Sequence, residues 1–177
     1  GMRQHKSEIE AIINSTEEPS FDNVIAAIDY SGRMLDRVST VFFNMTSSNT
    51  NDELQNIAKE IAPKLSAHGD DISLNPELFK KVEAVYNKKE SLNLNREQEI
   101  LLELTYKGFV RSGAKLDEQK QTRLREINQD MSVLTLQFGD NLLAEINNYK
   151  LVIESEADLA GLPSALVETA AETAKAN

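Results

Sequence analysis

An apolar seam at residues 21–45 constrains the fold more than any other feature of the chain. Apolar side chains recur there at alternating spacings of three and four residues, with one serine among them: Phe21, Val24, Ile28, Ser31, Leu35, Val38, Phe42 and Met45. This spacing places the side chains on one face of an α-helix, so it predicts a long helix packed closely against a partner helix. A polar run at residues 46–49 ends the pattern.

A second seam follows Asp117, whose side chain can cap a helix. It predicts a rod of some thirty residues, roughly 45 Å long at about 1.5 Å per residue. Its apolar positions are Leu124, Ile127, Met131, Leu134, Phe138, Leu142 and Ile146. The side chains of Phe42, Met45, Met131 and Phe138 in the two seams are expected to lie in the core.

Shorter amphipathic segments at residues 3–14, 54–65, 76–86, 95–109 and 164–176 complete a helical pattern. Start signals precede several of the predicted helices: Ser20, a capping box from Thr50 to Glu53, Asn75 followed by proline, and Asn95. Pro63 is expected to kink the third helix or start a new segment, and Gly69 to end that helix beside His68.

The predicted fold class is all-α, built of antiparallel helical hairpins or a bundle with long helices. The apolar, β-branched run at residues 149–153 predicts a short strand or extended arm. We expect two parts: a helical lobe at residues 1–147, and an extended arm with the start of a further helical section at residues 148–177.

Charge and composition exclude several classes of function. The chain carries 29 acidic and 19 basic residues, for a net charge of -10, which disfavours binding to nucleic acid or to an anionic membrane. It has no cysteine, so disulfides, thiol nucleophiles and cysteine metal ligands are excluded. No apolar run reaches the about 18 residues of a membrane span.

The two histidines, His5 and His68, give no metal-binding pattern. Neither is followed by glutamate, no H-x-x-x-H pair exists, and the stretch from His5 to Glu8 has the reverse order of a di-iron E-x-x-H motif. His68 is expected near a helix C-terminus, where its charged form suits the helix dipole. We therefore predict no metal ligands and no bound cofactor in this chain.

Adjacent carboxylates are the remaining candidates for acid–base chemistry. They occur as Glu17-Glu18, Asp70-Asp71 and Asp117-Glu118, and each pair is expected at a helix edge or in a loop. Capping and solvation explain such pairs more simply than catalysis. No G-x-S-x-G, P-loop or glycine-rich dinucleotide turn is present. The sequence therefore predicts no catalytic residue.

Several long stretches resemble one family of zinc metallopeptidases, which comprises peptidyl-dipeptidase (dipeptidyl carboxypeptidase), oligopeptidase A and thimet oligopeptidase. The resemblance is carried by structural segments rather than catalytic motifs. They are HKSEIEAI near the start, PSFDNVIAAIDYSGRMLDRVSTVFFNMTSSNTNDELQ, APKLSAHGDDISLNPELF, YKGFVRSGAKLD, and DLAGLPSALVETAAETAK near the end. The peptidyl-dipeptidase branch is the best match.

The resemblance implies an N-terminal helical lobe that forms one wall of a narrow channel for short peptides. In this family an H-E-x-x-H helix and a later glutamate hold the zinc, and this chain contains no such motif. The zinc therefore belongs to the full-length parent enzyme, and no catalytic or metal residue carries over to a position here. The chain alone is predicted to be inactive.

A stand-alone helical binding or scaffold module without enzymatic activity is the alternative reading. Abrupt ends favour truncation of a longer protein. The expected partners are the catalytic lobe of the same chain and, in the parent, short peptides, with no nucleic acid and no membrane. A truncated lobe is also expected to self-associate through uncovered apolar surface. The cytoplasm is the expected compartment, and the periplasm is the alternative.

Overall fold

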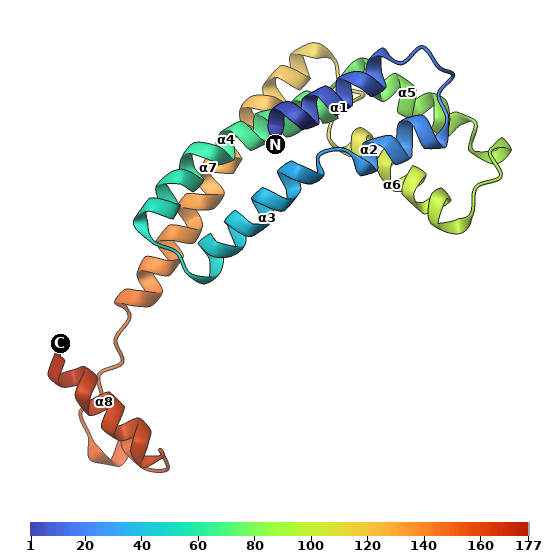
Figure 1. Cartoon of the computed structure of the whole chain (residues 1–177). Helices are drawn as coiled ribbons and strands as arrows, with labels where there is room; N and C mark the ends of the chain where they lie inside the picture. The colour runs from blue at the N-terminus through green and yellow to red at the C-terminus, as the bar shows by residue number, and fades with distance from the viewer. Residues whose placement is uncertain (177) are drawn as a thin grey trace. The chain divides into compact units, whose positions relative to one another are not determined.

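The computed structural model describes residues 1–176 and contains helices and no strand within them (Figure 1). The predicted all-α fold class is therefore confirmed. Residues 149–153 form no regular structure, so the predicted strand is absent. The chain divides into two compact units, Gly1–Phe138 and Gly139–Asn177. The functional division expected after residue 147 stays a prediction.

The helices follow one another with short connections, many of them capped as the sequence predicts. In chain order they are α1 (Met2–Asn14), a π-helical segment (Phe21–Ala26), α2 (Ala27–Tyr30), α3 (Arg33–Ser48), α4 (Asp52–Ser73), α5 (Pro76–Asn87), α6 (Arg96–Arg111), α7 (Glu118–Asn148) and α8 (Ser164–Ala176). Single 3₁₀ turns lie at Lys89–Ser91 and Glu156–Leu159.

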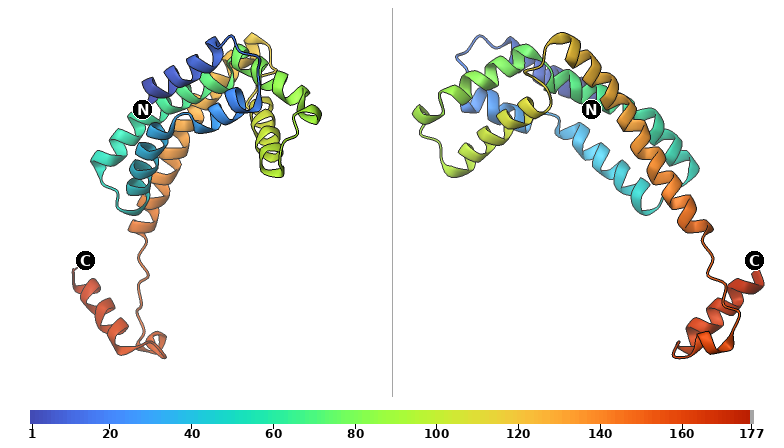
Figure 2. Two further views of the ribbon diagram at one scale, coloured as in Figure 1. Left: turned by 45° about the vertical axis from the view of Figure 1, so that its right-hand side comes forward. Right: turned by 180° about the vertical axis from the view of Figure 1, so that it is seen from behind.

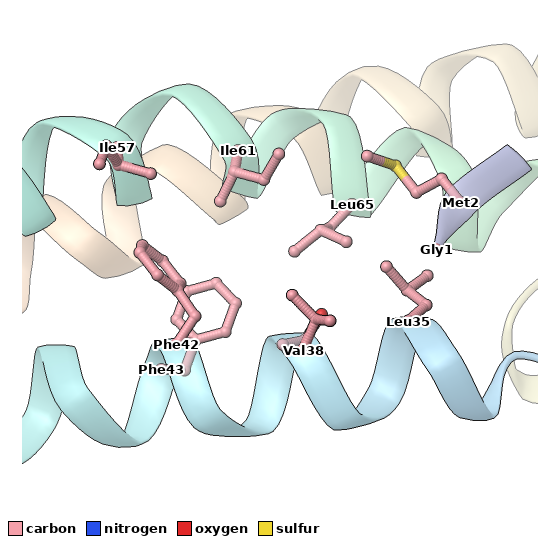
Figure 3. A pocket seen from close by; sticks show the side chains of 10 residues that line it. Gly1, Met2, Leu35, Val38, Phe42, Phe43, Ile57, Ile61 and Leu65 are labelled. Atoms are coloured by element: carbon pink, nitrogen blue, oxygen red, sulfur yellow. The ribbon is translucent and has the colours of Figure 1, made fainter.

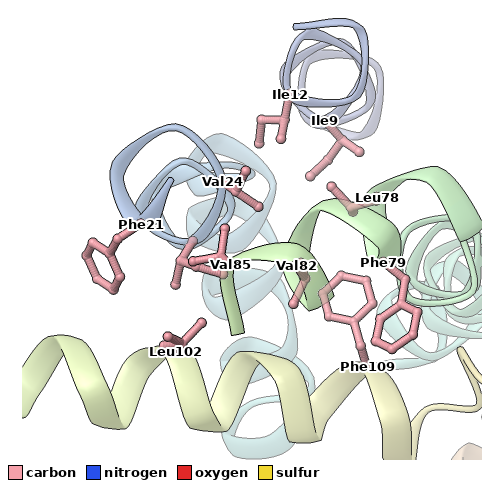
Figure 4. Packing of buried hydrophobic residues seen from close by; sticks show 11 residues of the cluster. Ile9, Ile12, Phe21, Val24, Leu78, Phe79, Val82, Val85, Leu102 and Phe109 are labelled. Carbon is pink, nitrogen blue, oxygen red and sulfur yellow. The ribbon is translucent and has the colours of Figure 1, made fainter. Parts of the chain in front are cut away.

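Helix α5 is the centre of the hydrophobic core in the first unit. It packs against α1, the π-helical segment and α6 (Figure 4). Leu78, Val82 and Val85 of α5 are completely buried, and each contributes about 1.5–3 kcal/mol through removal from water. The rest of the core cluster consists of Ile9, Ile12, Phe21, Val24, Ile25, Phe79, Leu102 and Phe109.

Side-chain caps fix where four of these helices begin. The Ser20 side chain and Asn23 satisfy each other's backbone amides in a capping box, and Asn95 does the same with Gln98. Asn75 accepts from two backbone amides at the start of α5, and Asp117 accepts from the amide of Lys120 at the start of α7. These four predicted caps are confirmed.

The single long helix predicted over residues 21–45 is wrong. The chain breaks at Ser31 and Gly32, where Gly32 adopts a left-handed conformation with φ of +73°. The break separates the seam into two parts with different partners. Phe21 and Val24 lie in the core, whereas Leu35 and the apolar residues after it lie on α3 and pack toward α4.

Helix α4 also differs from the prediction at both ends. Its N-cap is Asn51, which accepts from the Leu54 amide, rather than Thr50. The helix runs through Pro63 as one segment and continues past Gly69 to Ser73. His68 consequently lies inside a helix, one turn before its end, and not at a C-terminus. Helices α3 and α4 form an antiparallel hairpin (Figures 1 and 2).

Helix α7 is attached to the first unit by polar contacts near its start. Asn128 donates to Asp70 at 2.7 Å, and Arg125 pairs with Asp71 at 3.0 Å. None of the described α7 side chains is buried. Apart from Leu124, which is partly buried, the apolar seam predicted for this helix lies exposed among the residues that the structure describes.

The second unit holds the end of α7, the 3₁₀ turn at Glu156–Leu159 and α8. Gly161 takes a positive φ of 86° in the turn that leads to Pro163, a conformation that glycine adopts without strain. The predicted last helix at residues 164–176 is confirmed by α8.

Candidate functional site

An open apolar groove lies between α3 and α4, with the first residues of α1 at one end (Figure 3). Its volume is about 320 Å³. Its lining is almost wholly apolar and consists of Gly1, Met2, Leu35, Val38, Ser39, Phe42, Phe43, Ile57, Ile61 and Leu65. The shape and chemistry suit apolar side chains rather than a charged ligand.

The second half of the predicted seam forms one wall of this groove. Leu35, Val38 and Phe42 recur on the face of α3 that points toward α4, and Phe42 meets Phe43 edge to face at 5.1 Å. Ile61 and Leu65 form the opposite wall. Val38 remains 59% exposed, so the α3–α4 contact leaves part of the seam open to another surface.

Further apolar side chains lie exposed on the part of α7 that belongs to the first unit. Phe138 is 72% exposed, and Met131 and Leu134 are more than half exposed. A row of large apolar residues on one helix is uncommon on the surface of a free monomer and is typical of an interface. The second unit likewise exposes Tyr149, Leu151 and Val152.

The two histidines, which no sequence pattern pairs, meet beside the end of the groove. The Nδ1 atom of His5 lies 3.1 Å from Nε2 of His68, and Nε2 of His5 lies 3.1 Å from the Ser31 hydroxyl. Sixty-three positions separate His5 from His68, so no local spacing could reveal the contact. It joins α1 to α4 and to the turn between α2 and α3.

The protons in this row can be assigned from the partners. The Ser31 hydroxyl has a single proton and donates it to the Ile28 carbonyl at 2.7 Å. His5 must then donate from Nε2 to Ser31 and accept at Nδ1 from Nε2–H of His68. Ser31 therefore gives its proton to backbone and receives one from His5, which is the wrong direction for a serine nucleophile activated by histidine.

Burial and neighbouring charges lower the pKa of both rings. For His5, burial lowers the pKa most, the proximity of His68 lowers it further, and Glu8 opposes this. For His68, burial again lowers the pKa, while Asp71 raises it and Lys6 lowers it. Both rings are therefore favoured in the neutral form at neutral pH.

Glu8 supports the same junction from α1. Its carboxylate accepts from the buried Gly32 amide at 2.7 Å, and this bond, more than that from Gln4, lowers the pKa of Glu8. The reversed motif from His5 to Glu8 thus places both side chains on the turn around Gly32. The two side chains therefore hold α1 against the turn between α2 and α3 through hydrogen bonds.

The adjacent carboxylate pairs occupy structural positions. Glu18 pairs with Lys88, and Glu17 accepts from the Asn23 amide group at 3.3 Å. Asp70 and Asp71 hold α7 through Asn128 and Arg125, as described above, and Asp117 caps α7. None of the three pairs lines the apolar groove.

The described residues contain no group of three or more His, Asp or Glu side chains placed to hold a metal ion. A catalytic zinc needs three protein ligands and an open position. The His5–His68 pair offers two rings, and both nitrogens of His5 already have partners. These residues do not fit a catalytic zinc. Within residues 1–176, no helix is both long and apolar enough to cross a membrane.

Sequence comparisons find similarity between this chain and several peptidases. It is 41% identical over 175 residues to a dipeptidyl carboxypeptidase of Escherichia coli, covering 99% of this chain and 26% of that protein. The chain is related to the dipeptidyl carboxypeptidases. An oligopeptidase A of Haemophilus influenzae is 28% identical over 90% of this chain and 24% of its own length.

Proteins with lower identity to this chain also match nearly all of it. A probable cytosolic oligopeptidase A of Arabidopsis thaliana is 21% identical over 98% of this chain and 25% of its own length. No family profile matches the chain. The chain thus spans about a quarter of the length of the curated relatives it matches, a share consistent with an N-terminal region of a dipeptidyl carboxypeptidase.

Proposed function

We propose that the chain is the non-catalytic, N-terminal helical lobe of a zinc-dependent peptidyl-dipeptidase or oligopeptidase and forms one wall of its substrate channel. The observation that carries the proposal is the similarity to a dipeptidyl carboxypeptidase over 99% of this chain and only 26% of that protein. In the complete enzyme, zinc and its ligands would reside in the other three quarters of the length, which hydrolyse short peptides.

The uncovered apolar surface supports this role. The open side of the groove and the exposed seam of α7 offer the kind of surface that a second lobe would cover. The partners proposed are therefore the remainder of the same polypeptide and, within the complete enzyme, short peptides. The net charge of -10 gives no support to a nucleic-acid partner. We propose the cytoplasm as its compartment, supported by the name of the Arabidopsis relative.

An activity assay tests the first half of the proposal. The purified chain, supplied with zinc and an internally quenched fluorescent peptide, should give no hydrolysis, because its sequence has no H-E-x-x-H and residues 1–176 hold no three-ligand zinc site. Turnover that survives a further purification step and disappears with a chelator would refute the inactivity of this chain.

A chimaera tests the second half. In the dipeptidyl carboxypeptidase of Escherichia coli, the section that matches this chain is exchanged for the 175 matching residues of this chain, and release of dipeptides is measured. We expect the chimaera to fold and to retain activity. A chimaera that is soluble and binds zinc but cannot hydrolyse peptides would contradict the assignment of this chain as an equivalent channel wall.

A stand-alone helical binding module is the second candidate, and the open groove of about 320 Å³ is the observation that favours it. The two candidate functions predict different lengths for the reading frame that encodes this chain. A reading frame that continues for several hundred codons to H-E-x-x-H supports the lobe, whereas a stop codon directly after Asn177 supports the module.

A further inference from the structure

Three elements of the first unit meet at the histidine pair. His5 comes from α1, His68 from α4, and Ser31 from the turn between α2 and α3. Each lies three or four residues from a residue that lines the end of the groove, namely Met2, Leu65 and Leu35. The pair therefore holds α1 and α4, which both shape the groove, to the turn that leads into α3.

The hydrogen-bond row has a fixed capacity for protons. With both rings neutral, His68 donates from Nε2 and His5 accepts at Nδ1. A first additional proton can enter at Nδ1 of His68, because that nitrogen takes no part in the row, and the Nε2 donor then becomes stronger. A second proton has only Nδ1 of His5 left, and there two N–H donors would face each other at 3.1 Å.

We propose that the His5–His68 contact is a proton-operated latch that fastens the first turns of α1 to α4 and to the α2–α3 turn, and that it opens when the pair takes up its second proton. In the open state the two imidazolium rings separate. Gly1 and Met2 then leave the groove, because they precede His5 on the same helix.

The charges around the pair set the direction of the pH dependence. Glu8 on α1 and Asp71 on α4 favour proton uptake, but Asp71 is shared with Arg125 of α7, and Lys6 on α1 opposes uptake. Burial outweighs these carboxylates and lowers the pKa of both rings. The latch is therefore closed at neutral pH and opens only in acid, below the usual histidine range of about 6.5.

The opening is limited to the start of α1. Ile9 and Ile12 stay in the hydrophobic core, which does not titrate. The Glu8 carboxylate also stays bound to the Gly32 amide, because the pKa of Glu8 is lowered by that same bond. Acid is thus expected to free residues before Glu8 and leave the rest of the first unit folded.

Nuclear magnetic resonance can test the latch without ambiguity, because His5 and His68 are the only histidines. Imidazole ¹⁵N shifts are recorded from pH 7.5 to 4.5, together with amide exchange corrected for its intrinsic pH dependence. We expect two separate proton steps, both below pH 6.5. The second step should coincide with at least tenfold faster exchange at Lys6 and Ser7 and unchanged exchange in α5.

Variants separate the latch from general acid instability. In His68→Gln, the side-chain amide can donate to neutral His5, and after rotation its oxygen can accept from Nδ1 of protonated His5, so the acid-induced exchange at residues 6 and 7 should disappear. Thermal unfolding at pH 7.5 checks that this variant is folded. Two results would overturn the proposal. One is independent titration of both wild-type rings near pH 6.5, and the other is an amide exchange rate at residues 6 and 7 that does not change at the second protonation step.

Discussion

Gly32 is the residue on which the arrangement of the first half of the chain depends most. Its positive φ turns the backbone between α2 and α3, and it lies in direct contact with His5. A Cβ atom built at this position would lie 2.8 Å from Nδ1 and Cε1 of the His5 ring. Any other residue at position 32 would therefore both strain the backbone and displace the His5 ring from its contact with His68.

Gly32→Ala is expected to destabilise the chain by about 1–2 kcal/mol from the left-handed conformation alone, with an added cost from the His5 contact. Urea denaturation followed by circular dichroism measures this. Gly108→Ala is the matched control, since Gly108 lies exposed within α6 with nothing within 4 Å of its Cβ position. That control should gain up to about 1 kcal/mol. Equal effects of the two substitutions would contradict this role for Gly32.

Local signals at single residues were predictable, and contacts between distant residues were not. Ser20, Asn75, Asn95 and Asp117 cap the helices expected because a cap involves only neighbours within three positions. The pairing of His5 with His68 depends on how α1 packs on α4. No spacing in the sequence encodes that packing, so the most polar feature of the site was missed.

At the scale of elements, a buried carboxylate determines how α7 is held on α4. Asp70 is 7% exposed and accepts a 2.7 Å bond from Asn128. Burial of a charged group without a partner is costly, so this bond contributes more than the surface ion pair next to it. The seam of α7 remains largely exposed, so the prediction that Met131 and Phe138 lie in the core is wrong.

Asn128→Ala is expected to lower the free energy of unfolding by about 1–3 kcal/mol, because it leaves the Asp70 carboxylate without its donor. Gln129→Ala changes a neighbouring exposed amide on the same helix and should have little effect. Thermal unfolding of the two variants, monitored by far-ultraviolet circular dichroism, gives the comparison. A loss no larger for Asn128→Ala than for Gln129→Ala would show that Asp70 finds solvent instead.

The predicted helix ends were wrong where the apolar periodicity and the local helix-breaking residues pointed to different boundaries. The seam through residues 21–45 continues across Gly32 in phase, so periodicity alone predicted one helix. Pro63 and Gly69 are common helix breakers, yet α4 includes both and extends to Ser73. Helix existence followed from the pattern, whereas continuity depended on tertiary packing that the pattern does not contain.

At the scale of the whole molecule, exposed apolar surface competes with net charge. The chain carries -10 charges, which repel a second copy at low ionic strength. Salt screens this repulsion over about 8 Å at physiological ionic strength. Association through apolar faces should therefore strengthen as salt is added, the reverse of what ion pairs between copies would give.

Sedimentation velocity over a range of protein concentrations should show an average mass that rises with concentration, and more steeply at 0.5 M than at 0.05 M sodium chloride. The double variant Met131→Glu/Leu134→Glu should reduce the rise. Gln129→Glu/Thr135→Glu adds the same charge to the same helix without removing apolar surface and serves as the control. A wild-type mass that stays at one chain throughout would contradict self-association.

The position of the core along the chain has a consequence for synthesis on the ribosome. Every buried apolar side chain lies between Ile9 and Phe109 among the described residues. Helical units close within milliseconds or faster, whereas a ribosome adds only about 5–20 residues each second. The core can therefore close as soon as α6 leaves the exit tunnel, while α8 is still being translated. The nascent chain would then hold a closed core while the exposed face of α7 emerges after it, available to whatever covers that face.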